Sequence, residues 1–393
     1  MSTEIGVEIR RKIKDAYTVT LPSLVLSQIF GLFGGTFLGK YFKTIRTEFP
    51  GLLVVLPGMM GLRGNVFGSM ASRFSTMLYL GELEPSMRER RVLKETTLRM
   101  VVSLIPVILL WGIGVLSGID KNALDVLIII MTSTILVSFI LGYFTSFVTI
   151  FSFRRGTDPD SVAAPLVASM GDFLTVPSLV LFILLLDRSP GAFRVFNYAM
   201  IGLFILLLFI SRIGKSDFIE VKPVFVTVTL LAVLSVISGT LLAKFSGIIQ
   251  ASVILGFIYP SILSSFGNYG SIVAAKTSTK LHIGEIEKFL CPKAFSDILA
   301  LLSTTPLIGA LMVVFGGALM RLTAGLPVPR SAYLIVATYP FMALFIMLYS
   351  YTVSYILFRK NIDPDHVAIP LISNNSDIFG TAYVVLMAKL MVG

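Results

Sequence analysis

One long segment of this sequence occurs twice. GNVFGSMASRFSTMLYLGELE at 64–84 returns as GNYGSIVAAKTSTKLHIGEIE at 267–287, and the two copies align without a gap. The chain is therefore predicted to contain two copies of one structural unit. Shorter pairs keep the same order and nearly the same spacing: GGTFLGK at 34–40 with SGTLLAK at 238–244, and PLVASMGD at 165–172 with PLISNNSD at 370–377.

The composition places these units in a membrane. Of the 393 residues 55% are apolar and 14% charged, with a mean hydropathy of +0.89, whereas soluble domains carry about a quarter charged residues. A net charge of +10 therefore does not indicate nucleic-acid binding here. The single cysteine, Cys291, excludes an intrachain disulfide and a cysteine metal cluster.

Eleven apolar stretches are long enough to cross a bilayer. The sixth has no counterpart, while five lie before it and five after it. We predict an all-α polytopic membrane protein with about eleven transmembrane helices, arranged as two parallel five-helix repeats joined by a linker helix. The predicted parts are a cytosolic segment at 1–16, the first repeat at 17–186, the linker with the sixth helix at 187–222, and the second repeat at 223–393.

Basic residues predict the orientation. With the N-terminus in the cytosol, lysine and arginine favour the cytosolic segments by about two to one, as the positive-inside rule requires. We therefore expect an integral protein of the plasma or inner membrane, with the N-terminus cytosolic and the C-terminus outside.

Two aspartates lie inside predicted spans. Asp172 and Asp377 each follow the start of their span by about twelve residues, or about 18 Å of helix, which places them near the bilayer midplane. Acids at this depth are costly and usually face a polar pathway. An alternative is a structural ion pair with a basic residue such as Arg63, but Phe266 holds the equivalent position in the second repeat.

The repeat symmetry predicts that these two carboxylates face one another. Two carboxylates at close range do not both ionise easily, and a divalent cation removes the conflict. Without histidine or cysteine at this level, oxygen ligands favour Mg²⁺ or Ca²⁺, and two carboxylates fit a hydrated Mg²⁺ best. We predict divalent cation transport, with Mg²⁺ as the transported ion, through a pore at the pseudo-two-fold repeat interface.

Small and amide residues are the other candidates for the pore wall. In the first copy, Gly64, Gly68, Ser72 and Thr76 recur at every fourth residue, and small residues at this spacing also let helices pack closely in lipid. The amides could serve helix–helix hydrogen bonds instead. The candidate pore-lining residues are Gly64, Asn65, Ser169, Gly267, Asn268 and Asn374.

A second group of acids repeats at the predicted cytosolic ends of two helices. These are Glu82, Glu84, Glu285 and Glu287. They could form a cytosolic cation site that senses the ion, or they could be solvated helix ends balanced by nearby bases.

Several segments carry a resemblance to a known family. They are PGMMGLRGNVFGSMASRFST at 57–76, YPSILSSFGNYGSIVAAKTST at 259–279, PLVASMGD at 165–172 and the DPD turns at 158–160 and 363–365. Together they resemble the MgtE magnesium channels and their relatives of solute carrier family 41. The resemblance covers nearly the whole chain. It implies that two MgtE-like units are fused through an extra span, and that the family's pore aspartate corresponds to Asp172 and Asp377. Only sixteen residues precede the first span, so we do not expect the soluble magnesium-sensing domain of bacterial MgtE proteins.

Other functions are open at this stage. A cation exchanger coupled to Na⁺ or H⁺ could use the same acids. An intramembrane aspartyl protease also uses two aspartates, but SMGD carries Ser169 where the GxGD motif of that class has glycine. We expect no enzyme activity, no nucleic-acid partner, and contacts with divalent cations and lipid. One chain is expected to suffice for the pore, with a homodimer left open.

Overall fold

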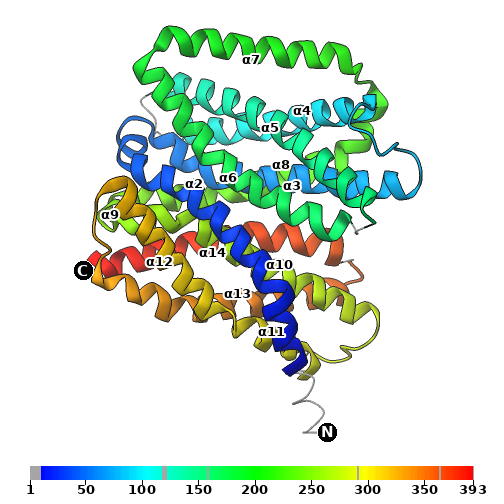
Figure 1. Ribbon diagram of the computed structural model, residues 1–393, viewed down its shortest axis with the longest axis vertical. Coiled ribbons are helices and arrows are strands. Elements are labelled where there is room, and N and C mark those ends of the chain that lie inside the picture. Colours follow the sequence, from blue (N-terminus) through cyan, green and yellow to red (C-terminus); the bar gives the residue numbers. More distant parts are fainter. Residues whose placement is uncertain (1–9, 117–121, 157–158, 290–291, 363, 393) are drawn as a thin grey trace. The chain divides into compact units, whose positions relative to one another are not determined.

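The computed structural model describes residues 10–116, 122–156, 159–289, 292–362 and 364–392, and these residues form helices without any strand (Figure 1). Each of the eleven predicted spans contains a long helix or a pair of helices. In the first half these are α2 (Leu21–Glu48, entered through a π-helical turn at Ala16–Thr20), α3 (Pro50–Tyr79), α4 (Arg90–Leu116), α5 (Ala123–Arg154), α6 (Pro159–Arg188) and α7 (Pro190–Ser211). In the second half they are α8 (Lys215–Lys244), α9 (Ser246–Ala251), α10 (Val253–His282), α11 (Pro292–Leu302), α12 (Thr305–Ala324), a 3₁₀ turn at Arg330–Ala332, α13 (Tyr333–Arg359) and α14 (Pro364–Val392).

The prediction of an all-α polytopic membrane protein is confirmed. Within the described ranges, nine helices are long and apolar enough to cross a membrane. The other two predicted spans form α10 and α14, which are 30 and 29 residues long but are not among the nine. Both helices carry several hydroxyl and amide side chains, including Asn268 and Asn374, and this lowers their hydropathy. Polar helices of this kind are tolerated in membranes where other protein segments cover them.

The chain divides into two compact units that do not follow the order of the sequence. Unit 1 contains Met1–Lys40 and Phe245–Gly393, and unit 2 contains Tyr41–Lys244. The first helix of the second repeat, α8, therefore belongs to the unit with α3 to α6, and most of α2 belongs to the unit with α10 to α14. The predicted boundaries at 17–186 and 223–393 describe the sequence repeat and stay a prediction.

In unit 2, α8 crosses α3 at very short range. A Cβ atom on Gly239 would lie 1.7 Å from the backbone carbonyl oxygen of Val54, so only glycine fits there. One turn earlier, a Cβ on Gly58 would lie 3.3 Å from the Cβ of Ser235. Small residues at a crossing allow this close approach of helix backbones in lipid.

Unit 1 contains the same crossing, made by α2 on α10. A Cβ on Gly35 would lie 1.8 Å from the carbonyl oxygen of Phe257, and the hydroxyl groups of Ser27 and Ser264 form a hydrogen bond of 2.9 Å. Gly35 and Gly239 hold the same position in the repeated motifs GGTFLGK and SGTLLAK. The motif therefore fixes the crossing of a first helix on a second helix, and in each unit the first helix comes from the other repeat.

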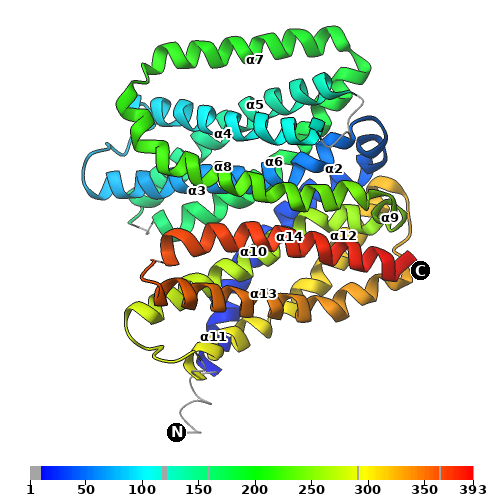
Figure 2. The same ribbon diagram turned by 180° about the vertical axis from the view of Figure 1, so that it is seen from behind.

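The helix without a counterpart, α7, packs beside α4, α5 and α6 in unit 2 (Figure 2). It is one of the nine apolar helices, and few of its side chains are buried. Exposed Val195, Tyr198 and Phe209 give it the apolar surface of a lipid-facing helix.

Candidate functional site

Asp172 lies on α6, which packs along α3 through small residues. A Cβ on Gly64 would touch the Cβ of Ala168 at 3.5 Å, and a Cβ on Gly171 would lie 3.4 Å from the Cβ of Arg63. This contact places the carboxylate of Asp172 half-buried beside α3. Gly64 therefore has a packing role, as its spacing indicates.

Arg63 is fully buried in unit 2, at 0% exposure. Its Nη1 donates a hydrogen bond of 2.6 Å to Thr175 Oγ1, and its Nη2 donates one of 3.2 Å to Ser133 Oγ. Its positive charge also interacts with the carboxylate of Asp172. A structural partnership of Arg63 with Asp172 therefore stays an alternative in this unit, because a buried guanidinium needs a negative charge nearby.

Asp377 holds the equivalent position on α14 in unit 1. A Cβ on Gly267 would lie 3.5 Å from Ser373 Oγ, which repeats the contact of Gly64 with Ala168. The Asp377 side chain is 8% exposed, and its backbone carbonyl accepts a hydrogen bond of 2.8 Å from Thr381 Oγ1. Each aspartate is thus one helical turn after a small residue that contacts the second helix of its repeat.

Aromatic rings replace the guanidinium in unit 1. Phe266 stacks on Tyr339 at 5.1 Å and meets Tyr383 edge-on at 5.6 Å. A Cβ on Gly380 would lie 3.4 Å from the Phe266 ring, so the absence of a side chain makes room for it. Tyr383 and Thr338 share a hydrogen bond of 2.9 Å. The two units therefore keep the helix contact but differ in charge beside it.

The remaining predicted pore residues lie on the same helices. Asn65 and Asn268 are half-buried, and Asn268 Nδ2 donates a hydrogen bond of 2.8 Å to Ser27 Oγ within unit 1. Ser169 is 7% and Asn374 3% exposed, so the structure places both in contact with other protein atoms. One of the two roles predicted for the amides, a helix–helix hydrogen bond, is thus seen for Asn268.

A stripe of small and polar residues is the least buried face of α3. Most of this helix is covered by other protein segments, and 78% of its most apolar stretch is buried. Gly64 and Gly68 are nevertheless half-buried, and Ser72 and Thr76 are exposed. A Cβ on Gly68 would meet none of the described atoms outside its own helix within 4 Å. A face toward lipid would carry large apolar side chains, so this open face is suited to a polar pathway.

The four predicted cytosolic acids lie at equivalent helix ends. Gly81 and Gly284 end α3 and α10 with positive φ angles of 72° and 74°, which glycine adopts without strain. The acids Glu82, Glu84, Glu285 and Glu287 follow these turns and are exposed. In the described parts of the chain, no group of three or more His, Cys, Asp or Glu side chains could hold a metal ion. A cation site at these acids stays a prediction.

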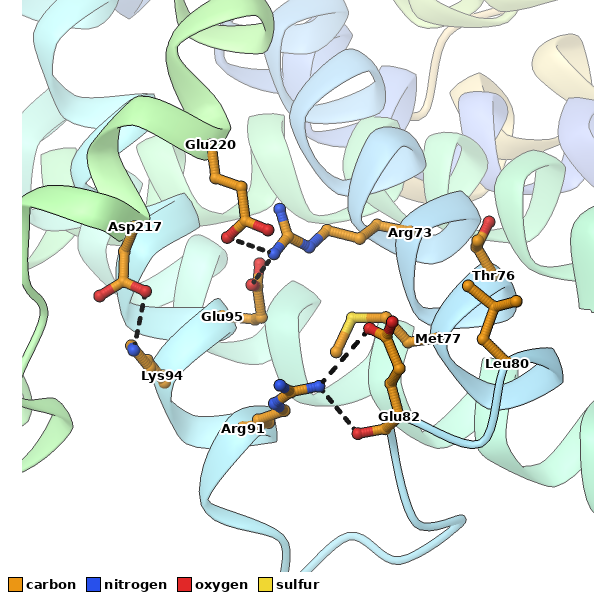
Figure 3. Close-up of a pocket in the computed structure, with 10 residues that line it drawn as sticks. All are labelled: Arg73, Thr76, Met77, Leu80, Glu82, Arg91, Lys94, Glu95, Asp217 and Glu220. Atoms are coloured by element: carbon orange, nitrogen blue, oxygen red, sulfur yellow. Dashed lines mark hydrogen bonds and ion pairs between the residues drawn. The ribbon is translucent and has the colours of Figure 1, made fainter.

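A charged cavity of about 370 Å³ lies in unit 2 near this helix end (Figure 3). Arg73 lies at its centre, with its Nη2 at 3.2 Å from a Glu95 oxygen and 2.7 Å from a Glu220 oxygen. Lys94 forms a 2.7 Å ion pair with Asp217 on α8. The sequence patterns did not predict this cluster, although the exchange of Arg73 for Lys276 between the repeats was a signal that the position needs a positive charge.

Unit 1 has a related cluster with the opposite arrangement of charges. Asp297 on α11 pairs with Lys12 at 3.4 Å, with Lys276 at 3.9 Å, and with Lys280. In unit 2 the first helix carries the acid, Asp217, whereas in unit 1 it carries the base, Lys12. The ion pair between the first and third helices is thus reversed in polarity.

Acids on membrane-spanning helices, packed beside small residues, are typical of proteins that move ions across a membrane. The sequence model of the MgtE family, described as divalent cation transporter, matches this chain twice, at residues 56–182 and 259–387. The chain therefore belongs to the MgtE family, whose members are transporters and not enzymes.

Curated relatives belong to solute carrier family 41. Member 2 of Xenopus laevis is 25% identical over 374 residues, which cover 86% of this chain and 65% of the relative. Member 3 of Rattus norvegicus is 23% identical over 366 residues, covering 85% of this chain and 78% of the relative. Human member 2 is 24% identical over 370 residues, with coverages of 85% and 63%. The chain thus spans about two thirds of the length of the first of these relatives. No solved structure matches the chain.

Proposed function

We propose that this protein moves divalent cations, Mg²⁺ above all, across a membrane, and that Asp172 and Asp377 bind the hydrated ion on its way. The single observation that carries the proposal is found in both repeats: a buried or half-buried acid lies one turn after a small residue that packs against a glycine of the second helix. The family match supports the class of substrate. That the two carboxylates serve one ion is an inference from the symmetry of the repeat.

The residues beside each aspartate fit a hydrated magnesium ion. Mg²⁺ loses its water slowly and is usually held by one or two carboxylates, with water filling the other positions. Asn65 and Asn268, on the helices that pack against those of the acids, offer amide oxygens that can accept hydrogen bonds from bound water. No histidine or cysteine lies within ten residues of either aspartate in the sequence, which disfavours Zn²⁺ as the cargo.

Purified protein in liposomes tests the proposal. We expect Mg²⁺ entry into vesicles loaded with a fluorescent indicator, and a fall of about tenfold or more in Asp172→Asn or Asp377→Asn, since a loss of about 1.4 kcal/mol in ion binding is a factor of ten. Asp187→Asn is the matched control, because Asp187 lies on the same helix as Asp172 but near its end. Equal losses in all three variants would contradict the proposal.

A cation exchanger is separated from a channel by the same preparation. A channel carries Mg²⁺ down a voltage gradient without Na⁺ or a pH gradient. If flux appears only when one of these is imposed, the acids serve coupled exchange instead.

Cysteines introduced on either side of the membrane in a Cys291→Ser background test the proposed orientation, with the N-terminus in the cytosol.

A further inference from the structure

The first repeat carries a buried positive charge beside its aspartate. Arg63 is 0% exposed, and its side chain donates two hydrogen bonds to the neutral oxygens of Thr175 and Ser133. Its Nε has no hydrogen-bond partner among the described residues. Neutral partners do not balance a buried charge, so the guanidinium depends on a nearby anion.

Two contacts place the side chain of Arg63 along the turn of α6 that carries Asp172. The Cβ of Arg63 lies 3.4 Å from the Cβ position of Gly171, which directly precedes Asp172, and its Nη1 reaches Thr175 on the next turn. The guanidinium therefore extends along the turn of α6 that carries the carboxylate. Asp172 is the one acid on this helix between Asp160 and Asp187.

The second repeat has no charge at the equivalent position. Phe266 is 0% exposed there, packed between Tyr339 and Tyr383 and against Gly380. Thr338 and Tyr383 lie 205 residues after Ser133 and Ser178, and both pairs are joined by a hydrogen bond. The polar scaffold around the position is thus kept, while its charge is exchanged for an aromatic ring.

We propose that Arg63 is a fixed competitor of the transported cation for Asp172. It lowers the affinity of the first repeat for a divalent cation and leaves Asp377 as the tighter ligand. A transport pathway needs binding that admits the ion and also releases it, and a tethered positive charge beside one acid weakens binding without closing the path. Arg63 therefore sets the affinity for Mg²⁺ and is not itself a ligand. This inference rests on the proposed function.

The test compares Mg²⁺ flux in liposomes for Arg63→Gln, Arg63→Lys and Ser133→Ala. Glutamine removes the charge but keeps a hydrogen-bonding group, and lysine keeps the charge. Alanine at position 133 leaves the charge of Arg63 in place and removes the hydrogen bonds of Ser133 to Arg63 and Ser178. We expect the half-saturating Mg²⁺ concentration to fall by about tenfold in Arg63→Gln, because the guanidinium no longer competes with the ion for the carboxylate of Asp172. Arg63→Lys and Ser133→Ala should stay within about twofold of the parent protein, because the charge remains.

A double variant covers the case in which Arg63→Gln does not fold. Asp172→Asn leaves Arg63 as an uncompensated charge that repels the ion, whereas Asp172→Asn with Arg63→Gln removes both charges together. We therefore expect the double variant to transport Mg²⁺ several-fold faster than Asp172→Asn alone and to unfold at a higher temperature.

The outcomes separate this inference from the proposed function. Normal flux in Asp172→Asn would contradict the proposed function. A severe loss in Asp172→Asn, with an unchanged half-saturating concentration in Arg63→Gln and no rescue in the double variant, would overturn only the role of Arg63. Equal shifts in the glutamine and lysine variants would also overturn it, because the effect would then not depend on charge.

Discussion

The two units place their second and last helices together in the same way but surround their aspartates differently. In both, a glycine of the second helix contacts a small residue one turn before the acid. Beside this contact, unit 2 has the buried guanidinium of Arg63, whereas unit 1 has a cluster of aromatic rings around Phe266. The two repeats therefore share the contact between the second and last helices, while the charge beside each acid differs between them.

A second contrast concerns the first helices. Both make the same glycine crossing, yet the ion pair between the first and third helices has opposite polarity in the two units. The first helix carries the acid, Asp217, in unit 2 and the base, Lys12, in unit 1. If each first helix packed instead with the helices of its own repeat, Lys12 would meet Lys94 and Asp217 would meet Asp297. Like charges at these positions would disfavour that arrangement.

The largest effect is expected from breaking the helix crossing that the two units share. Gly239→Val and Gly35→Val each force a side chain into a backbone carbonyl less than 2 Å from its first atom. We expect little or no folded protein by size-exclusion chromatography in detergent, because neither helix can yield without losing its packing. Gly202→Val on α7 is the control and should elute normally, because an added Cβ there would meet none of the described atoms outside its own helix within 4 Å. A normal elution profile for Gly239→Val would mean that the crossing is wrong.

Removing one acid at a time sharpens the comparison of the two units. We expect Asp172→Asn to be at least as damaging to Mg²⁺ flux as Asp377→Asn, and to lower the unfolding temperature more. The reason is that Asp172→Asn also leaves the buried charge of Arg63 without compensation. Thermal unfolding of both variants checks this order, and a less stable Asp377→Asn protein would contradict it.

Reversing the polarity of one first-helix ion pair gives a smaller effect. Lys94→Asp should lower the free energy of unfolding by about 1 kcal/mol, the scale of a partly exposed pair. Lys94→Asp combined with Asp217→Lys should recover most of it, since the pair is restored with opposite sign. Chemical unfolding of the two single variants and the double variant completes the cycle. Additive losses would show that the pair does not help to place α8.

The smallest effect is expected at the exposed acids. Replacing Glu82, Glu84, Glu285 and Glu287 by glutamine should weaken inhibition by internal Mg²⁺ by about threefold, because exposed carboxylates are screened by water and salt. Selectivity among divalent cations should not change. Flux measured at stepped internal Mg²⁺ concentrations checks this, and an unchanged dependence would assign the acids to solvated helix ends.

The sequence predicted the helices well, because apolar runs of about twenty residues have few other solutions in a bilayer. It also singled out Asp172 and Asp377 and the glycine motifs. It did not predict the exchange of first helices, since a glycine motif specifies close packing without saying which copy is the partner. The environment of Arg63 and the cavity around Arg73 also went unpredicted, because their partners come from helices far apart in the chain.

Flux of Mg²⁺ through the doubly substituted protein tests the central claim most directly. Asp172→Asn with Asp377→Asn removes both proposed ligands while keeping the size of each side chain. With equal amounts of folded protein in the liposomes, we predict Mg²⁺ entry no faster than in vesicles without protein, while Asp187→Asn transports normally. Undiminished Mg²⁺ entry through the double variant would contradict the claim that these two aspartates bind the transported ion.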